Sequence, residues 1–478
     1  MTRGDRGHIH VAHAHVAHAH VAHAHVVRMH DGLPTPRASH AFLSRRADTR
    51  VRQRDRSHLK KTGDTMRSAS TLARSEPVAG NLHGWLLVAT CWLASAGAVL
   101  IAPVLPFMQR DYAHEPHAVL LTMIVLVVPG LMIALFSPLV GSLVDLFGRK
   151  RLYMVAVTIY AIAGALPFWL TDLHAIIASR IVVGLAEATI NTIAAALTAN
   201  YFSGAERQKW LTMQHGSAAV VAVVMFTIGG ALGSLPSGWH TPFLVYGCAI
   251  VFLPLIAIFI WEPESDTHTE HVAAVQPRLP FPWREIGHLC AMTLFSAIMF
   301  FVIPVQISFV LNARGVATPA VIGFGSAIAN IGIPVGAFVF HRLGRWPINR
   351  LLVLAYACFT VGFSLIASVT DLNVTILGAL IACMGGGIAL PLLETWVMAR
   401  VPFAQSGRGA GGYMASFFLG NFLSPLIVAA VGGVAGGLIP AIGRFGMVCG
   451  GVAVIALVLV LAKRGPRESV QAVHAGAQ

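Results

Sequence analysis

Charged side chains are scarce in this sequence of 478 residues. Asp, Glu, Lys and Arg make up 11% of it and apolar residues 56%, whereas a soluble domain carries roughly 25% charged residues. So few charges cannot cover a surface that faces water, and most of the surface is therefore expected to face lipid. This scarcity argues against a large soluble helical protein with a buried core.

Patterns that mark several other classes of protein are also missing. The six cysteines all fall within apolar stretches and none forms a CxxC pair, so neither a disulfide framework nor a zinc site is indicated. No Walker nucleotide-binding pattern occurs, which argues against ATP as the energy source. The apolar stretches hold no constellation of metal ligands or nucleophiles. We therefore expect no enzymatic activity, no metal or other cofactor, and no nucleic-acid partner.

Long apolar runs are what the sequence has in abundance. A membrane-spanning helix needs about 20 mostly apolar residues, and backbone groups in lipid must bond within the segment, which favours helices. The alternation typical of barrel strands is absent. The sequence therefore predicts an all-α membrane protein with twelve transmembrane helices. The expected helices cover Gly84–Phe107, His117–Val144, Leu152–Thr171, Leu173–Phe202, His215–Ser234, Pro242–Trp261, Ile286–Ala313, Val316–Phe340, Leu351–Thr370, Leu372–Met398, Ala410–Val431 and Gly437–Ala462.

The longest polar break between these runs, Glu262–Glu285, separates six helices from six. Short motifs recur across it: Thr171–Leu173 (TDL) returns as Thr370–Leu372, and Gly148–Arg149 returns as Gly344–Arg345. These echoes indicate a duplicated six-helix unit, and such repeats place a substrate cavity at their interface. The expected parts are two six-helix bundles at 81–261 and 286–463, a linker at 262–285, a tail at 1–80 and a tail at 464–478.

The first 80 residues differ from the rest of the chain. They hold 14 Lys and Arg, 6 Asp and Glu and 11 of the 22 His, and the pentad VAHAH occurs three times in succession from Val11. Alternating His could chelate a metal through neutral imidazole, or the segment could be a disordered basic tail. A true start at or near Met66 is a third reading. No apolar h-region is present, so we expect no secretory signal peptide.

Basic residues are distributed unequally between the loops. The loops after the second, fourth, sixth, eighth and tenth helices hold 12 Lys and Arg in all. The loops on the opposite side hold only Arg110 and Arg314. Because Lys and Arg prefer the cytoplasmic side in short loops, both termini are expected in the cytoplasm. An even number of helices satisfies this topology.

The loop after the second helix reads GSLVDLFGRKR. It closely resembles the signature loop of the major facilitator superfamily. The resemblance implies a gate in which Asp145 pairs with a loop arginine and, when the protein faces outward, sits near the start of the eleventh helix, where a carboxylate is favoured. Gly141 would let two helices approach closely. A basic loop that only fixes topology is the alternative. The copy in the second half carries Ala337 and His341 instead. The matching residues are Gly141, Asp145, Gly148, Arg149, Lys150 and Arg151.

Two charges in the fourth helix are candidates for proton coupling. Intramembrane charges are costly and usually functional, and Arg180 and Glu187 are seven residues apart, so they share one helix face. The fragment also resembles the fourth-helix motif of proton-coupled exporters, with Arg180 and Gly184 matching, and that resemblance implies a coupling arginine. Glu187 is then the expected protonatable carboxylate. A static ion pair is the alternative. Glu394, in the tenth helix, is a possible substrate or gate residue.

Small and aromatic residues add weaker candidates. The fifth helix contains TIGGALGS, with Gly229, Gly230 and Gly233, which resembles a glycine-rich exporter motif but lacks its proline. Close helix packing is the alternative reading. Six large side chains could line an apolar cavity or simply pack: Trp92, Phe168, Met292, Phe300, Phe417 and Phe418.

Together these features predict a secondary active transporter of the inner membrane that works by alternating access. Proton-coupled efflux of a small organic molecule or drug is the favoured activity. Proton-linked uptake of a sugar or organic acid is one alternative, a non-transporting sensor with the same fold is another, and a metal exporter served by the His-rich tail is a third. Expected partners are the small-molecule substrate, protons and the lipid bilayer, and the expected oligomeric state is a monomer.

Overall fold

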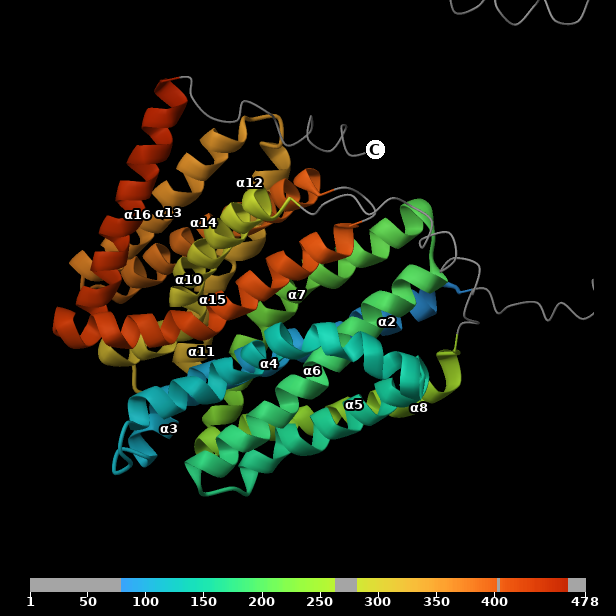
Figure 1. The fold of residues 1–478 in the computed structure, drawn as a ribbon. Coiled ribbons are helices and arrows are strands. Elements are labelled where there is room, and N and C mark those ends of the chain that lie inside the picture. The colour runs from blue at the N-terminus through green and yellow to red at the C-terminus, as the bar shows by residue number, and fades with distance from the viewer. Residues whose placement is uncertain (1–78, 263–281, 402–404, 463–478) are drawn as a thin grey trace, which may run out of the picture. The chain divides into compact units, whose positions relative to one another are not determined.

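The computed structural model describes residues 79–262, 282–401 and 405–462, all within one compact unit, Val78–Gln478. The His-rich tail and most of the central linker lie outside the described residues. Every regular element in the described ranges is a helix (Figure 1). In chain order the elements are α2 (Asn81–Ile101), η1 (Ala102–Val104), α3 (Leu105–Asp111), α4 (Ala118–Phe147), α5 (Arg149–Ala165), η2 (Leu166–Phe168), α6 (Leu173–Tyr201), α7 (Gly204–Gly233), η3 (Gly238–Val251), α8 (Phe252–Phe259), α10 (Trp283–Ala313), α11 (Pro319–Asn330), α12 (Gly332–Arg342), α13 (Ile348–Ser368), α14 (Leu372–Arg400), α15 (Ser406–Ala435) and α16 (Leu438–Leu461).

Grouped into continuous segments, these elements give twelve spans in the described ranges that are long and apolar enough to cross a membrane. The prediction of twelve transmembrane helices is confirmed, and most boundaries agree with it to within a few residues. The fifth span is the exception: α7 begins at Gly204, eleven residues before the expected start at His215. Arg207 and Lys209, expected in a loop, therefore lie on exposed turns of the helix. Helices extend past the hydrocarbon into the polar interface, where charges are tolerated.

The recurring TDL motif marks the same structural position in both halves. Asp172 is the N-cap of α6, and its carboxylate accepts backbone N–H bonds from His174 and Ala175 at 3.3 and 2.9 Å. Asp371 is the N-cap of α14 and accepts from Val374 at 3.0 Å. A carboxylate that satisfies free N–H groups at a helix start fixes that start, so the repeat in sequence is also a repeat in structure.

The second repeated motif, Gly148–Arg149 and Gly344–Arg345, does not mark equivalent structural positions. Gly148 adopts a left-handed backbone with φ 78° and directly precedes α5. In the second half, α13 begins only at Ile348, after Pro347, and Gly344 is not among the glycines with positive φ. The second half therefore turns into its third helix by a different route from that of the first.

Buried apolar side chains form two large clusters, one mainly from α2–α8 and one mainly from α10–α16. Within the first half, α4 packs on α6, α2 on α7 and α5 on η3. Within the second, α13 packs on α14 and α16, and α10 on α15. The halves meet where α4 contacts α15 and α7 contacts α11. This is the expected arrangement of two six-helix bundles (Figure 1).

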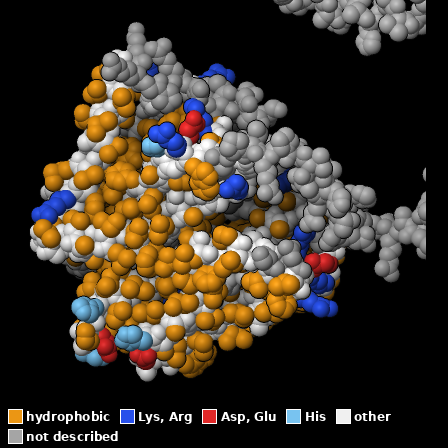
Figure 2. Space-filling model, viewed as in Figure 1, with side chains coloured by type: hydrophobic (Ala, Val, Ile, Leu, Met, Phe, Trp, Pro, Cys, Tyr) orange, Lys and Arg blue, Asp and Glu red, His pale blue; other side chains and the backbone are white. Residues whose placement is uncertain are grey.

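On the face shown in Figure 2, apolar side chains cover much of the described surface, and further large apolar side chains are exposed in both halves. Leu146, Ile258 and Val434 are 77%, 73% and 80% exposed. Soluble monomers rarely expose extended apolar patches. The described surface is therefore that of a multi-pass membrane protein, as the composition indicates.

Candidate functional site

Arg180 and Glu187 both lie inside the first bundle, on the buried side of α6. Arg180 is 0% exposed and Glu187 2% exposed. A buried charge without a partner is strongly disfavoured in an apolar interior, so the surroundings of these two side chains decide what they can do. The expectation that both occupy one helix face agrees with their common burial.

Tyr246, from η3, is the partner of Arg180. The Arg180 Nη2 atom donates a hydrogen bond to the Tyr246 hydroxyl at 2.6 Å, and the guanidinium carbon lies 4.6 Å from the centre of the tyrosine ring. The arginine thus has both a hydrogen bond and a cation–π contact. Tyr246 was not identified from the sequence, because a tyrosine in an apolar run carries no pattern that separates it from packing residues.

Glu187 reaches the same place from the next turns of α6. A Cβ atom built on Gly97 of α2 would lie 3.0 Å from Glu187 Oε1 and 2.9 Å from the Tyr246 hydroxyl. A side chain at this position would crowd both groups, and glycine leaves room for them. Gly97 therefore shapes a site made of Arg180, Tyr246 and Glu187.

The polar atoms of this site are incompletely paired. Among the described residues, Glu187 Oε1 and the Nε and Nη1 atoms of Arg180 have no hydrogen-bond partner, and the two side chains form no ion pair. An unpaired polar group in the interior costs about 1–3 kcal/mol. Whether these two side chains couple protons or only fix packing stays a prediction. The arrangement offers a carboxyl group that can take up or release a proton beside a permanent positive charge.

The loop of the superfamily signature is held by a residue that the sequence reading did not select. Glu262, just after α8, accepts the backbone N–H of Arg149 through Oε1 at 2.8 Å and that of Lys150 through Oε2 at 2.9 Å. The Lys150 ammonium donates to the carbonyl oxygen of Ala257 at 2.7 Å. A carboxylate at a helix N-terminus pairs with free N–H groups and with the positive end of the helix dipole. The start of α5 is therefore fastened to the end of the sixth span.

Other residues of the signature loop make fewer contacts with the rest of the described chain. No described atom lies within 4 Å of the position that a Cβ on Gly141 would take, so the predicted close helix contact at this glycine is not made in this structure. Arg151 is exposed. The side chain of Asp145 lies outside the described part, and its pairing stays a prediction. Glu394 is half-buried on α14 and lies near Tyr413 of α15.

Glycines bring the two bundles together where α7 ends and α11 begins. A Cβ on Gly230 would lie 2.4 Å from the Pro319 carbonyl oxygen and 2.8 Å from the Gly323 Cα. At the same end of the molecule, Ser234 Oγ accepts the backbone N–H of Ala320 at 3.1 Å. The glycine-rich segment of the fifth span thus packs helices closely, as its alternative reading proposed.

A polar contact lies at this same end. Arg110 Nη2 of α3 donates to Asn312 Oδ1 of α10 at 2.9 Å. Nearer the middle of the helices, Gly130 of α4 faces Asn421 of α15, with its Cβ position 3.2 Å from Asn421 Nδ2. These contacts join the two halves from the middle of the helices to this end. We call this interface between the halves the seam.

Aromatic side chains continue the seam from the second half. Phe301 of α10 contacts Phe417 of α15 at 5.1 Å between ring centres, and Phe417 contacts Phe418 at 5.2 Å. Phe418 packs against the cluster of Ile133, Val140 and Ala188 in the first half. Two of the six expected cavity residues thus lie at the junction of the bundles.

The chain matches the family model described as Major Facilitator Superfamily over residues 87–425. It is similar to the tetracycline resistance protein, class C, of Escherichia coli, with 25% identity over 370 residues, 72% of this chain and 88% of the relative. Among solved structures it is similar to a D-xylose-proton symporter, with a TM-score of 0.64 at 13% identity over 79% of this chain and 96% of the other. A bacterial homolog of the human lysosomal transporter Spinster, in an inward-facing and unoccupied conformation, gives a TM-score of 0.57 at 15% identity over 84% and 95% of the two chains.

Proposed function

This chain belongs to the Major Facilitator Superfamily, and we propose that it exports a small organic molecule in exchange for protons. Its family and its two-bundle fold make it a secondary transporter. Export rather than uptake is supported by the tetracycline resistance proteins, since resistance is what an exporter of a toxic compound confers. In this reading it binds a small molecule and protons and catalyses no reaction.

The observation that carries proton coupling is Glu187. It is buried inside the first bundle, its Oε1 atom has no hydrogen-bond partner among the described residues, and it lies beside Gly97 as does the Tyr246 hydroxyl that accepts from Arg180. Adding a proton to this carboxylate removes its charge, while the Arg180 charge remains. The balance of charge inside the bundle then changes by one unit without any side chain leaving the site. Such a change shifts the equilibrium between two conformations that solvate the site differently.

The conformation itself fits one step of the cycle. The contacts of Gly230 with Gly323 and of Arg110 with Asn312 seal one end of the seam between the bundles. By the distribution of basic residues this end faces outward, because the loops there carry few Lys and Arg. We infer that the structure is inward-facing, with both termini in the cytoplasm of an inner-membrane monomer. Rocking of one bundle against the other would then open the sealed end.

The signature loop is proposed as the gate of the opposite end. Glu262 ties the first turn of α5 to the end of the sixth span in the state described. Asp145 is proposed to add its pairing when the opposite end closes. Glu394, half-buried near the end of α14, is proposed to meet cationic cargo on that side.

The test is proton flux in proteoliposomes containing the full chain, with an imposed pH gradient and a panel of cationic drugs, sugars and organic acids. We expect cargo to drive proton flux with the wild type, and the Glu187→Gln variant to lose that flux while it still exchanges cargo for cargo. The matched control is Glu206→Gln, because Glu206 lies exposed at the start of α7.

Three results would change the proposal. Flux that persists in Glu187→Gln would move the proton site elsewhere, with Glu394 and Asp145 next in order. Cargo that moves in the same direction as protons would establish uptake. Absence of both flux and cargo exchange with every compound in the panel would favour a sensor that retains the fold.

A further inference from the structure

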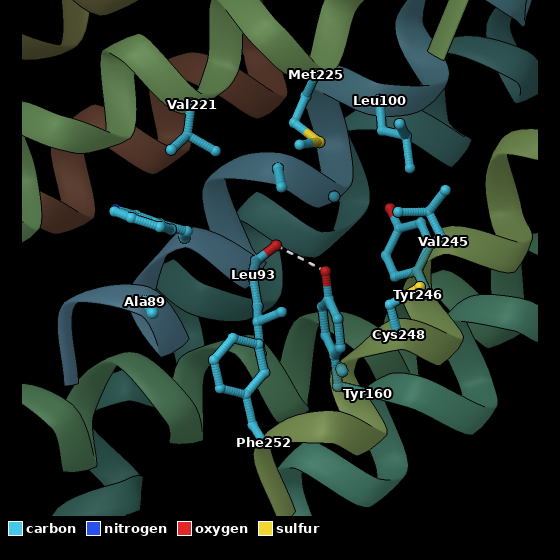
Figure 3. Close-up of a pocket in the computed structure, with 14 residues that line it drawn as sticks. Ala89, Leu93, Leu100, Tyr160, Val221, Met225, Val245, Tyr246, Cys248 and Phe252 are labelled. Atoms are coloured by element: carbon cyan, nitrogen blue, oxygen red, sulfur yellow. Dashed lines mark hydrogen bonds between the residues drawn. The ribbon is translucent and has the colours of Figure 1, made fainter. Parts of the chain in front are cut away.

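A small apolar pocket lies on the side of the first bundle, between α2, α7 and η3 (Figure 3). Its volume is about 180 Å³. Val221 and Met225 of α7 close one side, and Val245 and Tyr246 of η3 another (Figure 3). The proposed transport cycle gives this pocket no role, although Gly97 and Tyr246 belong both to its wall and to the candidate site.

The polar groups in the pocket wall already have partners within the protein. The Tyr160 hydroxyl donates to the carbonyl oxygen of Leu93 at 2.6 Å, the dashed contact of Figure 3. The Tyr246 hydroxyl accepts from Arg180 at 2.6 Å, and the Trp92 indole donates to a serine of α7 at 2.7 Å. A polar ligand would therefore find few groups to recognise it, and the pocket selects for hydrocarbon.

The surroundings of the pocket supply that hydrocarbon. All of its lining residues belong to candidate membrane spans, and residues 245–252 fall midway along the span Gly238–Phe259. Beside the pocket, Val220 and Val224 of α7 and Val251 at the end of η3 are 56%, 48% and 64% exposed. Apolar side chains exposed at the middle of a span face the acyl chains of the bilayer.

The volume separates the possible occupants. Sites for drug-sized ligands occupy roughly 300–1,000 Å³, so cargo of that size does not fit. A dry, apolar cavity of about 150 Å³ is large enough to hold one benzene molecule. The end of a hydrocarbon chain matches a pocket of about 180 Å³ that opens beside lipid.

We propose that this pocket binds the acyl chain of a bilayer phospholipid. The chain enters sideways from the membrane between α7 and η3 and packs against the rings of Trp92 and Tyr246. The interaction is non-polar burial, so it depends on the shape and length of the chain rather than on the headgroup.

The test uses the full chain in phosphatidylethanolamine–phosphatidylglycerol vesicles that contain a small fraction of phosphatidylcholine with a diazirine at the middle of one acyl chain. After illumination, adducts are located by mass spectrometry. We expect adducts at the lining residues Val221, Met225, Val245 and Cys248 to saturate as the fraction of diazirine lipid rises. Adducts on the outer face of α16, where Val454 and Ile455 are exposed, should rise in proportion to it.

Two variants distinguish lipid bound in the pocket from lipid that merely contacts the protein surface. Ala96→Phe fills the pocket from α2, and we expect a several-fold loss of the saturable adducts. Ala231→Phe adds the same ring at an exposed position of α7 outside the pocket lining and should leave them unchanged. The saturation curve of the wild type stands even if a variant fails to fold.

Two outcomes would overturn the proposal. Adducts at the pocket that rise linearly, as they do on α16, would mean that the lining meets only bulk lipid. Saturable adducts displaced by transported cargo, at concentrations that leave the α16 adducts unchanged, would assign the pocket to the cargo instead of to an acyl chain.

Discussion

Replacing Gly230 by Ala should destabilise the sealed end of the seam and favour the opposite conformation. In the present structure the added Cβ would lie 2.4 Å from the Pro319 carbonyl oxygen and 2.8 Å from the Gly323 Cα, and ordinary contact begins at 3.4 Å. Both neighbours are backbone atoms, which cannot rotate away as a side chain can. The two helices must therefore separate by about 1 Å at this crossing, a strain that overpacking makes costly.

The size of the effect follows from that strain. Overpacking of a tight contact costs typically about 1–3 kcal/mol, and the cost falls on the sealed state, in which the α7–α11 crossing is closed. A difference of about 1–3 kcal/mol shifts an equilibrium roughly 5–150-fold. We expect the ratio of sealed to opposite conformation to fall by a factor in this range, and the turnover of transport to fall with it.

The assay measures a distance across the sealed end. Spin labels at Ala113→Cys and Ala317→Cys, both at exposed positions beside the seam, report the separation of the halves in a background without the native cysteines. Double electron–electron resonance should show one short distance in the parent and a large additional population of longer distances in Gly230→Ala.

Gly216→Ala is the matched control, because it lies on the same helix and its added Cβ would have no described atom within 4 Å. A Gly230→Ala distance distribution equal to that of Gly216→Ala would refute the reasoning. It would mean that α7 and α11 can relax without opening the seam.

Three further changes test other parts of the structure. Glu262→Ala removes the acceptor of the first two N–H groups of α5 and should lower the free energy of unfolding by about 1 kcal/mol, as loss of a helix cap does. Thermal unfolding of this variant, compared with Glu262→Gln and the wild type, measures the loss. Equal stability of Glu262→Ala and the wild type would contradict the capping role. Asp172 has its pKa lowered, chiefly by the hydrogen bond from the Ala175 backbone N–H. Its stabilisation is therefore present above the ordinary value of 3.8 and is lost as the pH falls through the lowered value, so the wild type and Asp172→Ala should differ in thermal midpoint at neutral pH and converge in acid; a difference that is independent of pH would argue against it. Tyr246→Phe removes the acceptor for Arg180, a charged hydrogen bond of about 2 kcal/mol, so fewer protons should move per cargo molecule; an unchanged ratio in the proteoliposome assay would exclude a role for the hydroxyl.

Much of the fold was predictable because lipid imposes simple rules. The length of the apolar runs was enough to locate twelve spans. The repeated TDL motif correctly marked two equivalent helix starts, at Asp172 and Asp371. The early start of α7 was missed because a rule that excludes charges cannot see a helix continue into the polar interface, where Arg207 and Lys209 lie.

The candidate site was only partly predictable. Arg180 and Glu187 could be selected because placing a charge inside a membrane costs free energy, and charges found there usually serve a function. Tyr246 and Gly97 were not found, because their importance arises from where separate helices cross, not from residue type. Glu262 was missed for a similar reason: a carboxylate beside a span resembles any interfacial charge until the start of α5 is seen to lie against it.

The bond between Glu262 and the start of α5 also joins segments that lie 113 residues apart in the chain. The backbone of Glu262 belongs to the end of the sixth span, whereas its carboxylate caps the first turn of the third. The first bundle therefore has a polar cross-link at this end in addition to its apolar packing. A displacement of either span at this point is passed directly to the other.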